Sequence, residues 1–167
     1  TEITVIENGV DVARTSLPQG SLSSYKRFVG DILPTQNEIS AIRASVRRLI
    51  AADKTGACAG SASELYGVGG SIRALSEVNA WLVPGASSEE ITRDDVNRML
   101  RDVVEHRRTF IDAVLHVSPE RIHTIVCGLA ILVEVFDELD GERLRICDRG
   151  VREGYLIERM LGELKSK

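Results

Sequence analysis

The Asn8-Gly9 pair constrains the fold of this chain more tightly than any other feature of its sequence. It joins two runs rich in β-branched residues, EITVIE at residues 2–7 and VDVARTSL at residues 10–17. Asparagine and glycine both tolerate the positive φ angles of a two-residue hairpin turn, so the pattern predicts an antiparallel β-hairpin. A Pro-Gln-Gly segment follows the second run and is expected to end it. Any fold for the chain must accommodate this hairpin.

Helical and strand-like patterns alternate along the rest of the chain. Apolar residues recur at helical spacing over residues 36–52, which indicates an amphipathic helix. Thr92 has Asp95 three residues later, as in a capping box at a helix start. This order predicts an α/β fold with helices packed on the faces of a small mixed sheet that includes the hairpin. Further helices are expected at residues 71–80, 96–104, 110–115, 122–139 (buried, with Gly128 as a candidate break) and 151–164, strands at 64–68 and 143–147, and loops at 55–63 and 79–88.

Composition excludes several classes of protein. With 167 residues, 43% of them hydrophobic and 28% charged, the chain is expected to form one globular domain, residues 1–167. Its net charge of −4 argues against general binding of DNA or anionic membranes but is compatible with a local basic pocket. The longest apolar stretch, residues 125–136, contains Glu134 and is too short to span a bilayer. No secretory leader is expected, because the first residues alternate like a strand.

The spacing of cysteines and histidines favours structural roles for both. The three cysteines form no CxxC pair, and an odd, scattered count is typical of reduced thiols in a cytoplasmic protein. His106, His116 and His123 share no metal-ligand spacing with one another or with the cysteines. No Ser/His/Asp or Cys/His set indicates a nucleophilic site. The sequence therefore predicts a cytoplasmic protein with no metal ligands of its own.

A glycine-rich turn is the first candidate binding element. Gly67, Gly69 and Gly70 lie where a strand pattern changes into a helix pattern, and Ser71 and Arg73 follow. Glycine lets a ligand approach the backbone, and the free N–H groups and dipole of a helix start favour an anion. Neither the P-loop nor the Rossmann pattern is complete here. The alternative is a tight strand-to-helix turn that the serine caps and that binds nothing.

Two arginines near other helix starts are further candidates. Arg152 belongs to a charged DRGVREG segment that follows a strand and opens a helix. Arg121 follows Pro119-Glu120 just before the long apolar run. A guanidinium fork matches phosphate oxygens, so either side chain could contact a phosphate. The alternatives are an ion-paired helix cap for the first and a solvated first-turn charge for the second.

Five blocks of the sequence, taken in order, resemble the exopolyphosphatase/guanosine pentaphosphatase (Ppx/GppA) family. They span nearly the whole chain at family-like separations. The family usually has threonine where this chain has Ser71 and leucine where it has Val151. The blocks are Thr1-Glu2-Ile3, Ser16-Leu17-Pro18-Gln19-Gly20-Ser21, GVGGSIRAL at residues 67–75, Pro119-Glu120-Arg121 with GLAIL at residues 128–132, and DRGVREG at residues 148–154.

The resemblance implies a ribonuclease-H-like half-domain of the actin-like ATPase superfamily, whose members place two such domains around a cleft. The chain matches only the second domain, so residues 1–167 are expected to be that half, with the first domain absent. The family places a DIGGGS phosphate loop just before the strand that begins here at Thr1, and a water-activating glutamate in its first domain. Neither is in this chain, which is therefore expected to be inactive alone.

The resemblance also implies a substrate and partners. Family members remove terminal phosphate from polyphosphate, or the 5′-γ-phosphate from guanosine pentaphosphate (pppGpp). They use a divalent metal such as Mg²⁺, whose ligands are expected mainly in the absent half. A homodimer is expected, with the chain's own first domain as a further partner. The residues expected on the cleft wall are Gly67, Gly69, Gly70, Ser71 and Arg73, with Arg121 and Arg152 as additional phosphate contacts.

Two other classes of protein share this superfamily fold. One is half of a sugar or acetate kinase, which would bind ATP at residues 67–71 and transfer phosphate to a small molecule. The other is a non-enzymatic actin-like assembly ATPase domain. The DRGVREG block favours the phosphatase over both.

Overall fold

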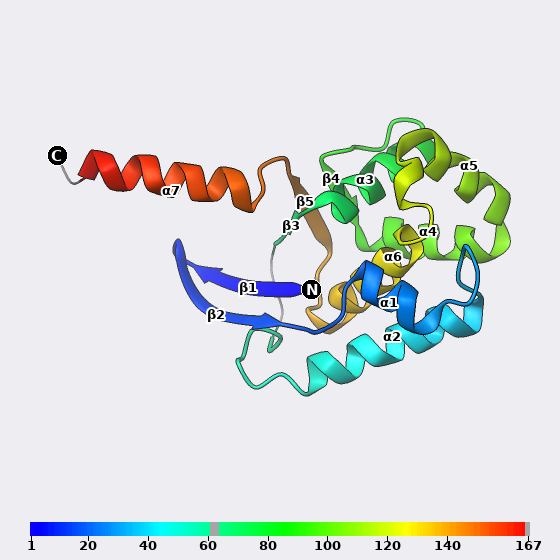
Figure 1. Ribbon diagram of the computed structural model, residues 1–167, viewed down its shortest axis with the longest axis horizontal. Coiled ribbons are helices and arrows are strands. Elements are labelled where there is room, and N and C mark those ends of the chain that lie inside the picture. The colour runs from blue at the N-terminus through cyan, green and yellow to red at the C-terminus, as the bar shows by residue number, and fades with distance from the viewer. Residues whose placement is uncertain (61–63, 166–167) are drawn as a thin grey trace.

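The chain begins with the expected hairpin. In the computed structural model, which describes residues 1–60 and 64–165, β1 (Glu2–Glu7) and β2 (Val10–Ser16) pair antiparallel (Figure 1). Asn8 and Gly9 have φ angles of 51° and 78°, the positive values that the turn needs. The hairpin prediction is confirmed.

Seven α-helices and three more strands follow within the described residues. The helix expected over residues 36–52 is confirmed, and so is the capping box at Thr92, whose side chain accepts from the Asp95 amide. One short helix and one three-residue strand had no predicted counterpart, because neither is long enough to show a clear period. In order, the elements are α1 (Ser21–Phe28), α2 (Gln36–Ala51), β3 (Leu65–Val68), α3 (Gly70–Leu82), β4 (Glu90–Thr92), α4 (Arg93–Glu105), α5 (Arg107–Val117), a 3₁₀ turn (Pro119–Arg121), α6 (Ile125–Glu138), β5 (Arg143–Cys147) and α7 (Val151–Lys165).

The strands form two sheets rather than the one expected. β3 pairs parallel with β5, and β4 pairs antiparallel with the other side of β5. The hairpin forms a separate two-stranded sheet, so the prediction of a single sheet containing all these strands is wrong for the described part of the chain. The hairpin is anchored only at its base, where Leu17 is buried, whereas Ile6, Val10 and Val12 nearer its tip are exposed.

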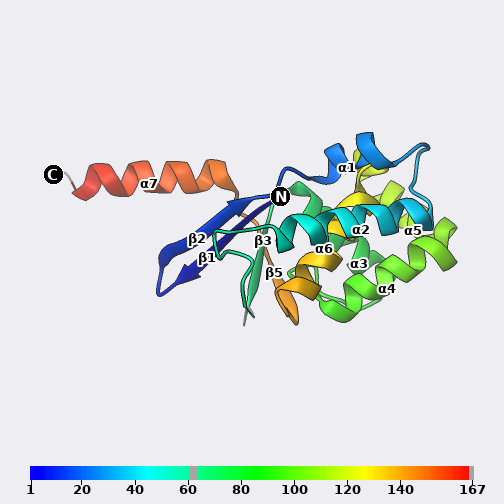
Figure 2. The same cartoon turned by 90° about the horizontal axis from the view of Figure 1, so that it is seen from below.

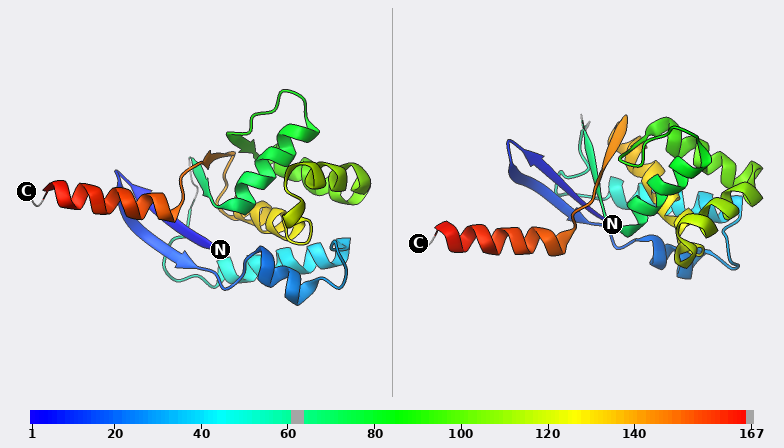
Figure 3. Two further views of the ribbon diagram at one scale, coloured as in Figure 1. Left: turned by 45° about the horizontal axis from the view of Figure 1, so that its top comes forward. Right: turned by 90° about the horizontal axis from the view of Figure 1, so that it is seen from above.

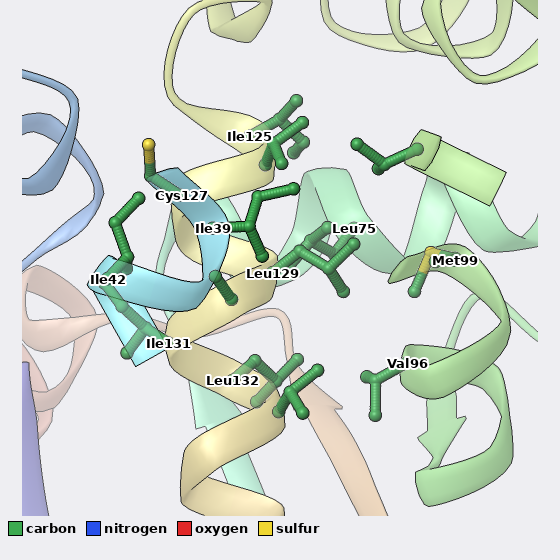
Figure 4. Packing of buried hydrophobic residues seen from close by; sticks show 14 of the residues in the cluster. Ile39, Ile42, Leu75, Val96, Met99, Ile125, Cys127, Leu129, Ile131 and Leu132 are labelled. Carbon is green, nitrogen blue, oxygen red and sulfur yellow. The ribbon is translucent and has the colours of Figure 1, made fainter. Parts of the chain in front are cut away.

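Helix α6 forms the centre of the core. Side chains from α2, α3 and α4 converge on it, as Figure 4 shows. It is buried on every side from Ile125 to Glu134, as its almost entirely apolar sequence predicts, and each fully buried large apolar side chain contributes roughly 1.5–3 kcal/mol. Gly128 does not divide it, because the Gly128 amide continues the helix by donating to the Thr124 carbonyl at 3.0 Å. The buried helix is confirmed and the break is not.

Helix α7 does not close over the core, although a closing helix was expected there. It extends away from the packed helices, on the same side of the molecule as the hairpin (Figures 1, 2 and 3). Tyr155, Leu156, Ile157 and Met160 are all exposed on it. No helix in the described part of the chain is long and apolar enough to cross a membrane.

Two smaller expectations differ from the structure, and a third is confirmed as far as the described residues reach. The strand at residues 64–68 was expected to be buried, but Tyr66 and Val68 are 59% and 51% exposed. Leu115 was assigned to an apolar helix face and is 49% exposed. The loop expected over residues 55–63 is confirmed through residue 60, and its last three residues lie outside the described part.

Candidate phosphate-binding site

The site forms where two parallel strands end. Because β3 and β5 are parallel, their carboxyl ends lie at the same edge of the sheet. β3 leads into α3 and β5 leads into α7. In open α/β sheets, ligands bind beyond the carboxyl ends of the strands, and here two helix N-termini follow those ends.

The turn between β3 and α3 leaves the start of α3 uncapped by any side chain. Gly69 is the N-cap residue, and its φ of 121° and ψ of 163° are accessible only to glycine. The Arg73 amide donates to the Gly69 carbonyl at 3.2 Å, which makes it the first intrahelical bond. The amides of Gly70, Ser71 and Ile72 precede that bond, so the helix itself gives them no acceptor. They supply a fixed partial positive charge.

Arg121 lies directly over this helix start. A Cβ placed on Gly70 would overlap Nη2 of Arg121 and lie 3.0 Å from its Cζ. The Arg121 guanidinium pairs with Glu120 at 3.5 Å, and that carboxylate is 66% exposed to water. Glycine at position 70 is therefore required for a guanidinium to reach the helix start, and two residues proposed separately from the sequence are brought together.

A second helix start meets the first. The Ser21 hydroxyl, in the first turn of α1, lies 3.4 Å from the Ser71 hydroxyl. Gly128 of α6 packs beneath both serines. A Cβ placed on Gly128 would lie 3.7 Å from the Cβ of Ser21 and 3.7 Å from the Cβ of Ser71. No side chain caps α1 at Gly20. Ser21 and Gly128 belong to the matching blocks but were not predicted as site residues, although Gly20-Ser21 directly after a strand was a possible signal.

Arg73 and Arg152 share a neighbour, Glu153. Glu153 Oε2 accepts the Gly150 N–H at 2.7 Å at the start of α7. The pKa of Glu153 is lowered by backbone N–H groups, its own first and then that of Gly150, and further by Arg152 and Arg73. Both arginines therefore lie close enough to lower the pKa of one carboxylate at the strand ends. Arg152 is exposed, and no described residue is close enough to form an ion pair with Arg73 or Arg152.

Gly67 has a packing role. It is buried, and a Cβ there would lie 2.5 Å from both Ile72 Cγ2 and Leu144 Cδ2. Any side chain would force β3 away from β5 and α3. Gly67 therefore holds the turn in place from within the core, while Gly69, Gly70 and Ser71 are only partly buried.

The family follows from a comparison that covers nearly the whole chain. A sequence model of the Ppx/GppA phosphatase family matches residues 1–163. The chain belongs to this family. A curated relative from Photobacterium profundum, named guanosine-5'-triphosphate,3'-diphosphate pyrophosphatase, is 27% identical over 158 residues. That match covers 93% of this chain and 31% of the relative.

Solved structures of Ppx/GppA proteins share the fold. The Aquifex aeolicus family member superposes with a TM-score of 0.73 at 19% identity, covering 97% of this chain and 53% of that one. The type II variant of the same protein superposes with a TM-score of 0.70, covering 95% of this chain and 53% of that one. An exopolyphosphatase-like protein gives 0.65, with 89% and 51% covered. The actin-like α/β fold is confirmed, and the chain spans about half the length of these structures and a third of the curated relative.

Within residues 1–60 and 64–165 of this Ppx/GppA chain, no three His, Cys, Asp or Glu side chains lie close enough together to hold a metal ion. Burial raises the pKa of the Cys127 thiol to about 12, which keeps it protonated in the core. The ring of His116 packs against the ring of Trp81, and His106 Nδ1 lies 3.1 Å from Asp102 Oδ1, within hydrogen-bond distance.

One histidine stands beside the site. Tyr25, one turn after Ser21 in α1, donates its hydroxyl to the Asp31 carbonyl at 3.0 Å. Since a phenol has one proton, His123 Nδ1 donates to the Tyr25 oxygen at 3.3 Å rather than accepting from it. This contact fixes the orientation of the histidine two residues after Arg121.

Proposed function

We propose that this chain forms one wall of the active-site cleft of a two-domain phosphohydrolase that removes terminal phosphate from polyphosphate or pppGpp. The observation that carries the proposal is the Arg121 guanidinium lying on Gly70 where the starts of α1 and α3 meet. Helix-start amides, two hydroxyls and a guanidinium are all hydrogen-bond donors suited to phosphate oxygens. The remainder of the polypeptide supplies the opposite wall.

The wall is suited to stabilising charge rather than to activating water. In phosphoryl transfer, charge is spread over the equatorial oxygens of the moving group, and preorganised donors stabilise it. A general base for water must also be present. Glu153 lies close enough to Arg73 and Arg152 for both to lower its pKa, and a lowered pKa makes this carboxylate a weak base. The base is therefore assigned to the other half, together with the ligands of any Mg²⁺.

The relatives support this choice of substrate class over the alternatives. One is named a guanosine pentaphosphate pyrophosphatase and another is described as exopolyphosphatase-like. A sugar kinase half or an assembly ATPase domain would share the fold but not the family model that matches residues 1–163. We also propose that the complete polypeptide is a homodimer in the cytoplasm.

The 167-residue chain is expected to release no phosphate from long-chain polyphosphate in the presence of Mg²⁺. Its described residues supply donors for the phosphate, but the carboxylate beside Arg73 and Arg152 is a weak base and no three metal-ligating side chains lie together. Phosphate release by the purified chain, compared with the complete polypeptide at equal concentration, checks this. Turnover by the chain close to that of the complete polypeptide would contradict the division of roles between the halves.

Replacing Arg73 by alanine is expected to lower kcat/KM of the complete polypeptide about tenfold, which corresponds to about 1.4 kcal/mol. Arg73 lies in the first turn of α3 and acts on Glu153 at the same edge of the sheet, so it adds positive potential where a phosphate chain would bind. Steady-state rates at fixed salt measure the effect, with Arg108→Ala, an exposed position at the start of α5, as the control. Unchanged kcat and KM would remove Arg73 from the site.

A further inference from the structure

We propose that the rings of Tyr25 and His123 form a platform on which the guanine base of pppGpp stacks while its 5′-phosphates occupy the phosphate-binding site. This inference rests on the proposed function and deepens it. It assigns side chains that would distinguish a nucleotide substrate from polyphosphate.

The two rings are held in a fixed arrangement. Their centroids are 5.4 Å apart and their planes are tilted by 49°. His123 Nδ1 lies 3.3 Å from the Tyr25 hydroxyl oxygen, and that hydroxyl donates to the Asp31 carbonyl at 3.0 Å. These two hydrogen bonds orient the rings before any ligand arrives, and preorganised groups lose less freedom when a ligand binds.

The platform lies on the same two segments that frame the phosphate-binding site. Tyr25 follows Ser21 by one turn of α1, about 6 Å along the helix axis. His123 follows Arg121 in a turn that the Thr124 amide closes by donating to the Arg121 carbonyl at 2.9 Å. Helix α1 packs on α6, into which this turn leads (Figure 1). A ligand whose terminal phosphate lies between Ser21 and Arg121 therefore reaches the platform by running along α1.

The chemistry of the platform suits a base rather than a further phosphate. His123 is exposed and Tyr25 is half-buried, so ring surface is accessible to a ligand. Aromatic side chains, histidine among them, stack on nucleobases, and such stacking needs a flat π-face on the ligand. A polyphosphate chain has no such face. The platform therefore adds affinity for the nucleotide alone.

The alternative is a positioning role. In that case the contact between His123 and Tyr25 would serve only to tie α1 to the turn that carries Arg121. Loss of a positioning contact weakens the action of the guanidinium on every substrate alike. Loss of the platform affects only a substrate that carries a base, so the two roles predict different substrate ratios.

Replacing His123 by alanine in the complete polypeptide is expected to lower kcat/KM for pppGpp about tenfold and to leave kcat/KM for long-chain polyphosphate unchanged. A loss of that size is typical when a base loses a stacked aromatic ring. It is expected mainly in KM, because the base does not react. His123→Phe keeps a ring and is expected to retain most of kcat/KM for pppGpp. An equal fall on both substrates would overturn the platform in favour of positioning, and so would unchanged values on both.

His116→Ala is the matched control. The His116 ring is also exposed and pairs with the Trp81 ring at 5.9 Å, but Trp81 lies ten residues after Ser71 in α3, about 15 Å along the axis from the site. Both values of kcat/KM are expected to stay unchanged in this variant. A selective fall for pppGpp in His116→Ala as large as that in His123→Ala would overturn the assignment to this platform.

Equilibrium binding of pppGpp in the absence of divalent metal gives a second readout that needs no turnover. The complete polypeptide is expected to bind pppGpp, and His123→Ala is expected to bind it about tenfold more weakly. That result supports the platform even if neither substrate is hydrolysed, in which case only the proposed phosphohydrolase function fails. Equal binding by the two proteins, or no binding by the unaltered polypeptide, would overturn the platform.

Discussion

Replacing Arg43 by methionine is expected to lower the free energy of unfolding by about 3 kcal/mol. The carboxylate of Glu134, in the middle of α6, is fully buried. Arg43 Nε donates to its Oε1 at 2.5 Å, and Arg47 Nε donates to its Oε2 at 3.1 Å. Removing one partner of a buried pair leaves a buried charge short of compensation, which typically costs about 3–5 kcal/mol. Arg47 remains, so the lower end of that range is expected.

Urea unfolding of the chain measures this effect, and a double-mutant cycle isolates it. Arg43→Met combined with Glu134→Met removes both charges and is expected to recover most of the lost stability. Arg14→Met is the control, because Arg14 is 81% exposed and its pair with Asp11 is 3.8 Å long. A cost below about 1 kcal/mol for Arg43→Met, or strictly additive effects in the double variant, would contradict the account.

The local parts of this fold could be predicted from the sequence because short-range physics determines them. The turn at Asn8-Gly9 depends on two adjacent φ angles, and the helix start at Thr92 depends on one hydroxyl and one amide. The buried α6 follows from an uninterrupted apolar run. In each case the deciding interactions lie within a few residues.

The rest depends on contacts between distant residues, which no local pattern encodes. Ser21 and Ser71 are fifty residues apart in sequence, and their 3.4 Å contact is set by how α1 and α3 pack on Gly128. The guanidinium over Gly70 comes from an equally distant turn. One sheet uniting the hairpin with the strands near residues 64–68 and 143–147 was expected from the order of elements alone, and such an order does not determine which strands pair.

Replacing Arg121 by alanine in the complete polypeptide is expected to lower kcat/KM for phosphate release from polyphosphate by at least about 100-fold. Removing one preorganised donor from a site of developing charge typically costs a factor of about 10² to 10³. The loss is expected mainly in kcat, because a donor fixed against Gly70 acts most strongly on the charge of the transition state. Arg121→Lys keeps the charge without the fork and is expected to recover only part of the rate.

The fold is expected to survive this substitution. The Arg121 side chain is partly exposed, and its ion pair is with the exposed Glu120, so little stability depends on it. The Arg121 carbonyl, which accepts the Thr124 amide at 2.9 Å, is unchanged in the variant. A matched unfolding curve for Arg121→Ala separates loss of the donor from loss of structure.

The most direct test of the proposed cleft wall is kcat/KM for polyphosphate hydrolysis by the complete polypeptide, measured at fixed salt for Arg121→Ala beside the control Arg108→Ala. The account predicts a fall of at least about 100-fold for Arg121→Ala with a normal unfolding curve, and no change for Arg108→Ala. Equal values of kcat/KM for the two variants would contradict the claim that the Arg121 guanidinium over Gly70 binds the phosphate that is removed.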